Sequence, residues 1–111
     1  MDVGDVVWVD FPGGAGRAQA GRRPAIVFQS QQHTNRLSTV VVIPLTSKQD
    51  ALRFPATVLV EPTAANGLKS LSVALVFQIT AIDRRCLSAV AGRLDDNKIA
   101  EIRDELDNLT A

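Results

Sequence analysis

Cysteine and long apolar runs are both scarce in this chain of 111 residues. Cys86 is the only cysteine, so neither an internal disulfide nor a zinc site built from several cysteines can form. A membrane-spanning helix needs about 20 consecutive apolar residues, and the longest apolar runs here cover only residues 40–45 and 73–77. Asp2 and Asp5 lie where a secretory signal would carry basic residues. We therefore expect a soluble protein that stays in the cytoplasm and makes no use of a membrane.

The chain also lacks a surplus of charge, because 12 Lys and Arg balance 12 Asp and Glu. The distribution is nevertheless uneven. Residues 1–94 contain ten basic and six acidic side chains, whereas residues 95–111 contain two basic and six acidic ones. A basic body with an acidic tail hints at a nucleic-acid partner. It is equally consistent with a solvated acidic helix beside a near-neutral body, so charge alone does not decide between the two.

Aromatic residues make up only 5% of the chain, with no tyrosine and one tryptophan. SH3-type adaptors line their peptide groove with aromatic rings, so this composition disfavours a peptide-binding adaptor. Trp8 and Phe11 lie in an apolar segment and are expected in the core. Phe54, beside Arg53, is expected at the surface.

Short β-branched segments separated by turn-forming residues predict a mainly β protein. In residues 3–11, Val7, Val9 and Phe11 share one parity while Val6 and Trp8 share the other, as in a strand. The same composition predicts strands at residues 24–29, 38–46, 55–60 and 72–79, and a short last strand ending near residue 94. Residues 12–22 are rich in glycine and have no apolar side chain larger than alanine, which predicts a surface loop.

The end of the chain has a different period. Apolar residues at positions 99, 102, 106 and 109 are separated by steps of three, four and three, which is one face of a helix. Asp95 or Asp96 can cap its N-terminus. The length suits one domain over residues 1–111. We predict a small antiparallel barrel of SH3-like build, with six or seven strands and a C-terminal amphipathic helix.

Four segments resemble the MazF/PemK toxin family and occur in the family's order. Residues 4–11 (GDVVWVDF) resemble its opening strand, and residues 19–27 (QAGRRPAIV) resemble its loop-to-strand signature with Arg-Pro after Gly. Residues 40–47 (VVVIPLTS) resemble the strand that ends in Thr-Ser. Residues 67–79 (GLKSLSVALVFQI), followed by 82–85 (IDRR) and 92–94 (GRL), complete a match over residues 3–94.

The resemblance implies the toxin of a toxin–antitoxin system, an mRNA interferase that arrests growth. It implies a sequence-specific endoribonuclease that cuts single-stranded RNA without a metal or any other cofactor. The 2′-hydroxyl of the RNA would attack the adjacent phosphate, leaving a 2′,3′-cyclic phosphate and a 5′-hydroxyl. The implied partners are a second copy in a homodimer and a cognate antitoxin whose flexible tail lies across the RNA groove.

The resemblance maps the active-site Arg of the family to Arg23 and its active-site Thr to Thr46. A guanidinium donates two parallel hydrogen bonds to a phosphate and stays charged, so Arg23 suits stabilisation of the transition state and is a poor general base. Thr46, at a strand end, suits positioning of the RNA. Taken alone, an Arg before a Pro at a strand entrance is more often a surface residue in a turn, and Thr46 alone would be a strand-end capping residue. Arg22 also competes with Arg23 for the role.

The expected walls of an RNA groove are the loop at residues 13–21 and the segment at residues 48–53. His33 is the only group that titrates near neutrality, but it lies in a polar segment, and we favour a solvated side chain over a catalytic one. Gln78 matches a family glutamine, while Thr80 stands where some members have Arg, which removes a strand-borne cation. The predicted RNA-binding residues are Arg17, Gln19, Arg22, Asn35, Ser47, Lys48, Arg53 and Gln78.

The main alternative is a non-catalytic toxin on the same fold. The gyrase-poisoning CcdB toxins act by binding a protein, and in such a toxin the C-terminal helix would carry the contact. The Gly-Arg-Arg-Pro motif at residues 21–24 favours the ribonuclease, because a protein binder does not need an Arg directed at a phosphate.

Overall fold

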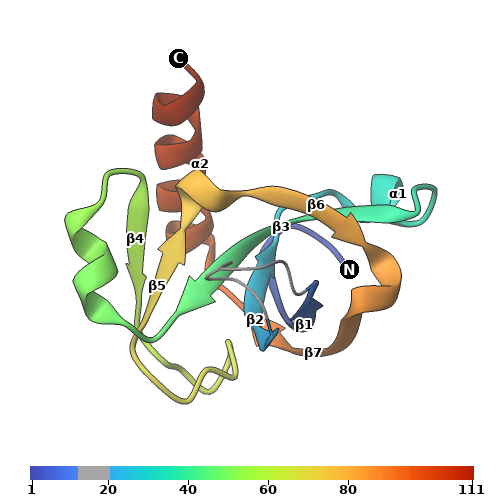
Figure 1. Cartoon of the computed structure of the whole chain (residues 1–111), viewed down its shortest axis with the longest axis horizontal. Coiled ribbons are helices and arrows are strands. Elements are labelled where there is room, and N and C mark those ends of the chain that lie inside the picture. The colour runs from blue at the N-terminus through green and yellow to red at the C-terminus, as the bar shows by residue number, and fades with distance from the viewer. Residues whose placement is uncertain (13–20) are drawn as a thin grey trace.

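The computed structural model describes residues 1–12 and 21–111, and within them seven antiparallel strands form one curved sheet (Figure 1). The strand order is β4-β5-β3-β2-β1-β7, and β6 also pairs with β3. The strands are β1 (Asp5–Phe11), β2 (Gly21–Val27), β3 (Thr39–Thr46), β4 (Thr57–Val60), β5 (Ser72–Leu75), β6 (Thr80–Asp83) and β7 (Leu87–Arg93). The helices are α1 (Gln31–Thr34) and α2 (Asp96–Thr110), with 3-10 turns η1 (Gln49–Arg53), η2 (Val76–Gln78) and η3 (Arg84–Cys86). The predicted mainly β, barrel-like fold with a C-terminal helix is confirmed.

The valine-rich strands are explained by a sheet that buries both of its faces. In β1, Val6 contributes to one core cluster together with Ile26 and Ile43, and α2 packs on this cluster. Val7 and Val9 point the other way, into a second cluster. Because successive side chains of a strand face opposite sides, a strand that is buried on both faces, such as β1 or β3, needs apolar residues at both parities. The parity predicted for residues 6–11 is therefore confirmed for the valines, which are all buried.

The prediction of a single continuous strand at residues 72–79 is wrong. The chain forms β5, then the 3-10 turn η2, then β6. The turn buries Val76 and exposes Phe77, which packs against Phe54 with ring centroids 5.8 Å apart. No Gly or Pro marks this break, so the sequence pattern alone could not reveal it.

The second strand begins earlier than predicted, at Gly21, so Arg22 lies in β2 and not in the preceding loop. β2 pairs with β3 only as far as Ala25↔Pro44, whereas β3 continues to Thr46 and pairs there with β5. Pro44 has no N–H to donate to a ladder. The first residues of β2 and the last residues of β3 are not paired with each other, and this fork in the sheet is where the candidate site lies.

The helix α2 forms as predicted. The Asp95 side chain accepts a hydrogen bond from the backbone N–H of Lys98, which caps the helix. Ile99 and Ile102 are buried against the sheet, whereas Leu109 is 46% exposed. Figure 1 shows the reason: the last turns of α2 project beyond β4 and β5. In the described part of the chain, no helix is long and apolar enough to cross a membrane.

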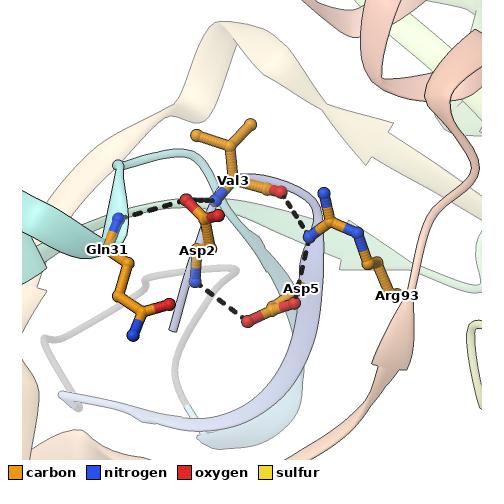
Figure 2. Close-up of polar contacts among 5 residues, drawn as sticks. All are labelled: Asp2, Val3, Asp5, Gln31 and Arg93. Atoms are coloured by element: carbon orange, nitrogen blue, oxygen red, sulfur yellow. Dashed lines mark hydrogen bonds and ion pairs between the residues drawn. The ribbon is translucent and has the colours of Figure 1, made fainter.

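A polar cluster ties the N-terminus to two distant segments (Figure 2). Asp2 Oδ1 accepts hydrogen bonds from the backbone N–H groups of Val3 and Gln31, at 2.9 and 3.1 Å. These bonds hold the pKa of the Asp2 carboxyl below its ordinary value, with the Val3 bond the larger cause. Arg93 donates to the Val3 carbonyl at 2.7 Å and to Asp5 Oδ1 at 3.3 Å. The cluster therefore joins β1, β7 and the start of α1.

Candidate nucleic-acid interface

A pocket of about 310 Å³ opens in the fork between β2 and β3, and we call it the first pocket. Its walls come from three segments that are far apart in the sequence: residues 22–24, residues 45–48 and residues 67–70. Trp8 and Ala91, from the neighbouring strands β1 and β7, also line it. The sheet register brings these segments together, so the site depends on tertiary structure.

The first pocket is strongly cationic. Its lining contains Arg22, Arg23, Lys48 and Lys69, and no Asp or Glu among the residues that the structure describes. Within residues 1–12 and 21–111, none of these four side chains forms an ion pair. Unpaired cations on a concave surface focus a positive potential, which favours an anionic ligand such as a phosphodiester. Four of the ten basic residues in residues 1–94 therefore lie together in this pocket.

Arg23 and Thr46 mark the boundary between the first pocket and a second one of about 210 Å³, because both residues line both pockets. If the pairing of Ala25 with Pro44 continued for two more residues, Arg23 and Thr46 would be direct partners. The fork prevents that pairing and leaves space between them. The backbone N–H of Lys48 donates to Thr46 Oγ1 at 3.2 Å, so the hydroxyl hydrogen of Thr46 remains available to a ligand.

Arg22 is oriented by two contacts. Its guanidinium lies over the Trp8 ring, 5.2 Å from the centroid, and donates to Ser88 Oγ at 3.2 Å. Trp8 is half-buried and lines the pocket, so the prediction that Trp8 belongs to the core is only partly correct, whereas Phe11 is buried as predicted. The two adjacent arginines therefore differ. Arg22 packs on the pocket rim, while the side chain of Arg23 has no hydrogen bond or ion pair to the described residues and lines both pockets.

The second pocket has a more mixed lining. Lys48 and Gln78 contribute polar groups, Phe54 and Phe77 contribute rings, and Asp50 contributes a carboxylate. Gln78 is half-buried at the end of η2. Phe54 is 44% exposed, as predicted. This pocket continues the cleft on the other side of Arg23 and Thr46, which gives an extended ligand room on both sides of that pair.

The structure brings together some of the sequence-predicted residues and leaves others apart. Arg22, Arg23, Thr46, Ser47, Lys48 and Gln78 line one or both pockets. Arg53 stacks over Phe54, 5.0 Å from the ring centroid, beside the second pocket but outside its lining. Asn35 follows α1 and lines neither pocket. Arg17 and Gln19 lie outside the described residues.

His33 lies in α1, also outside the lining of both pockets. Its Nδ1 is 2.8 Å from Ser30 Oγ, and its side chain is exposed. The sequence motifs missed Trp8, Lys69 and Ser70 as lining residues. Lys69 and Ser70 fall inside the matched segment 67–79, so their place in that segment was the available signal. In the described ranges, no group of three or more His, Cys, Asp or Glu side chains could hold a metal ion.

The curved sheet and the cationic cleft together define a small β protein with a cleft suited to an anionic ligand. A family model described as PemK-like, MazF-like toxin of type II toxin-antitoxin system matches residues 2–110. The chain belongs to this family of toxins. The resemblance drawn from the four sequence segments is therefore confirmed.

Two curated relatives are named as endoribonucleases. The chain is 32% identical over 88 residues to the endoribonuclease toxin MazF of Escherichia coli (strain K12), covering 79% of this chain and 73% of that protein. It is 29% identical over 107 residues to the endoribonuclease MazF of Staphylococcus saprophyticus, covering 96% and 88% of the two proteins.

Solved structures agree on the fold. MazF from Deinococcus radiodurans superposes with a TM-score of 0.82 at 28% identity, covering 99% of this chain and 96% of that one. A MazE-MazF structure from the same organism superposes with a TM-score of 0.79 at 25% identity, covering 100% and 95%.

Proposed function

We propose that this protein, as a toxin endoribonuclease of the PemK-like, MazF-like family, cleaves single-stranded RNA at particular sequences and without a metal ion. The observation that carries the proposal is the cleft itself. Four cations and no described carboxylate line the first pocket, and Arg23 and Thr46 stand where this pocket meets the second. A chain of nucleotides can pass through both pockets with one phosphate at the boundary.

The proposed reaction uses the 2′-hydroxyl of the RNA as its nucleophile. The 2′-oxygen forms a bond to phosphorus and loses its proton, while the bond from phosphorus to the 5′-oxygen breaks and that oxygen gains a proton. The products are a 2′,3′-cyclic phosphate and a 5′-hydroxyl. Negative charge builds on the phosphate oxygens in between, and preorganised donors stabilise it.

Arg23 and Thr46 have separate roles in this scheme. The Arg23 guanidinium donates to the phosphate oxygens and stays charged throughout, so it stabilises the transition state and does not act as the base. Thr46 accepts the Lys48 backbone N–H, which directs its own O–H toward the ligand. Thr46 therefore positions the phosphate or the 2′-hydroxyl. Lys48, which lines both pockets, adds positive potential at the same place.

The proposed partners are a second copy of the chain and a cognate antitoxin. The solved MazE-MazF structures of Deinococcus radiodurans support an antitoxin partner for a protein of this fold. An extended acidic segment suits the cationic first pocket, because its carboxylates would occupy the place of the RNA phosphates. Since the substrate is cellular RNA, the proposed site of action is the cytoplasm.

The test is cleavage of a long unstructured RNA by the purified protein in the presence of EDTA. We expect discrete fragments whose 5′ ends accept phosphate from a polynucleotide kinase without prior phosphatase treatment. Arg23→Ala should lower the cleavage rate by about 100-fold or more. Arg85→Ala is the matched control, because Arg85 is an exposed arginine that pairs with Asp83 and lines neither pocket.

Two outcomes would count against the proposal. Cleavage that EDTA abolishes would show that a metal is required. Intact RNA after incubation with several unrelated sequences would favour the protein-binding alternative, in which a CcdB-like contact on α2 inhibits a target such as gyrase. The exposed Leu109 on the projecting end of α2 is the surface that such a contact would use.

A further inference from the structure

The loop at residues 61–70 forms the third wall of the first pocket, and it is held more firmly than a surface loop usually is. Its centre is Asn66, which is only 4% exposed. Asn66 Oδ1 accepts from the backbone N–H groups of Thr63 and Leu68, at 3.0 and 2.9 Å. Asn66 Nδ2 donates to the Glu61 carbonyl at 2.9 Å. One side chain thus satisfies three backbone groups and defines the shape of the loop.

The loop also lies directly on β7. The backbone N–H of Arg93 donates to the Ala65 carbonyl at 2.8 Å. Gly67 has φ +70°, and a methyl group added there would overlap the Ala91 carbonyl. A methyl group at Gly92 would overlap the Ala65 carbonyl. Glycine at both positions lets the two backbones touch, so the loop cannot shift without breaking this contact.

The rigid loop presents a polar edge to the pocket. Gly67, Leu68, Lys69 and Ser70 all line it. Leu68 packs on the core cluster that contains Val6, Ile26 and Ile43, and this contact anchors the wall to the core. Lys69 is exposed and makes no ion pair or side-chain hydrogen bond with the described residues. A lysine with three free donors therefore stands on a fixed support at the mouth of the pocket.

The remaining lining of the first pocket is apolar. Trp8, Pro24, Leu45 and Leu68 contribute to it, together with the buried Val6. A site for phosphate alone has no need of such a surface. A nucleobase, in contrast, has apolar faces and a polar edge, and RNA-binding proteins read unstacked bases in that way. The volume of about 310 Å³ lies at the small end of the range for ligand pockets, which is roughly 300–1,000 Å³.

We propose that the first pocket seats one nucleobase next to the cleaved phosphate, and that Lys69 on the 61–70 loop selects a base with a carbonyl edge, uracil or guanine. An ammonium only donates hydrogen bonds, so it suits the O4 of uracil or the O6 of guanine and opposes the amino groups that stand in place of these oxygens in cytosine and adenine. Ser70 lies beside it on the same wall. Asn66 is a positioning residue, because it touches no ligand and acts through the loop. This inference rests on the proposed function and adds a specificity determinant to it.

The experiment is cleavage of an RNA with a randomised stretch, followed by sequencing of the new 5′ ends, for the wild type and for Lys69→Ala. We expect the wild type to favour uracil or guanine at the position that adjoins the cleaved bond. Lys69→Ala should reduce that preference by about ten- to a hundredfold, the worth of one hydrogen bond to a charged group. Lys98→Ala is the matched control, since Lys98 pairs with Glu101 outside the pocket, and its preference should equal that of the wild type.

If a variant cuts RNA too slowly for its base preference to be sequenced, a binding measurement replaces cleavage. Four oligonucleotides that differ only in this base, with a 2′-deoxy sugar at the attacking position, bind without being cut, and their dissociation constants report the same selection. Asn66→Ala should weaken the base preference through the loop, and Asn66→Asp, which keeps the acceptor for Thr63 and Leu68, should recover part of it. A wild type that cuts no RNA refutes the proposed function and the inference with it. A wild type that cuts, beside a Lys69→Ala variant with the same base preference, refutes the inference alone.

Discussion

Three glycine-to-alanine substitutions separate backbone strain from steric overlap around the first pocket. Gly21 has φ +99° with no described atom within contact distance of an added methyl group, so Gly21→Ala introduces strain only. Gly92 has overlap with the backbone of residues 65 and 66 and no positive φ, so Gly92→Ala introduces overlap only. Gly67 combines φ +70° with overlap at the Ala91 carbonyl. The expected order of destabilisation is therefore Gly67→Ala, then Gly92→Ala, then Gly21→Ala.

The magnitudes follow from the contacts that each methyl group disturbs. A non-glycine residue held at positive φ costs about 1–2 kcal/mol. Overlap at Gly92 adds an overpacking cost of about 1–3 kcal/mol. Separation of the loop from β7 also breaks the bond from the Arg93 N–H to the Ala65 carbonyl, worth about 1 kcal/mol. The expected losses are about 1–2 kcal/mol for Gly21→Ala, about 2–4 kcal/mol for Gly92→Ala and about 3–6 kcal/mol for Gly67→Ala.

Denaturant unfolding followed by tryptophan fluorescence measures these losses, because Trp8 is the only tryptophan and lines the same pocket. Gly92→Ala should also change the base preference of cleavage, although Gly92 itself does not line the pocket, because the methyl group would displace the 61–70 loop. A Gly92→Ala variant within about 0.5 kcal/mol of the wild type in free energy of unfolding would show that the loop yields easily. The account of a rigid third wall would then be refuted.

Three further outcomes are expected. Thr46→Val should lower kcat by about 10–100-fold through loss of its O–H, and Thr46→Ser should restore most of it; equal rates for the two variants would contradict a role for the hydroxyl. Ile102→Ala should destabilise the fold by about 2–5 kcal/mol because Ile102 is fully buried, whereas Leu109→Ala, at a side chain 46% exposed, should cost under about 1 kcal/mol; denaturant melts compare the two. Hydrogen bonds from the Arg85 side chain and, second, from its backbone N–H lower the pKa of the Asp83 carboxyl to about 2. NMR titration of Arg85→Ala should show that pKa rising part of the way toward 3.8, because only the side-chain bonds are lost. Because the folded-state pKa is depressed, the stabilisation is present above the unfolded-state pKa and is lost as the pH falls toward 2, and a titration unchanged by the substitution would refute the pairing.

Elements governed by local pattern could be predicted from the sequence. The helix period of residues 99–109 predicts α2, and Asp95 caps it as expected. The parity of β1 predicts a strand whose valines are buried. Both patterns follow from the geometry of a single element, in which neighbouring side chains alternate or recur every three to four residues. The family resemblance also predicts Arg23 and Thr46 as site residues, because each lies in a short contiguous motif.

Tertiary structure decided the features that depend on distant segments. The 3-10 turn between β5 and β6 places Phe77 against Phe54, more than 20 residues away in the sequence, and no local residue signals this break. Trp8 lines the pocket because the fork beside β2 leaves its ring uncovered there, and the Arg22 guanidinium lies over the same ring. Lys69 joins the site because Asn66 shapes its loop and β7 holds it. Local periodicity determines what each segment becomes, whereas the register between strands determines which side chains meet, and that register depends on contacts separated by tens of residues.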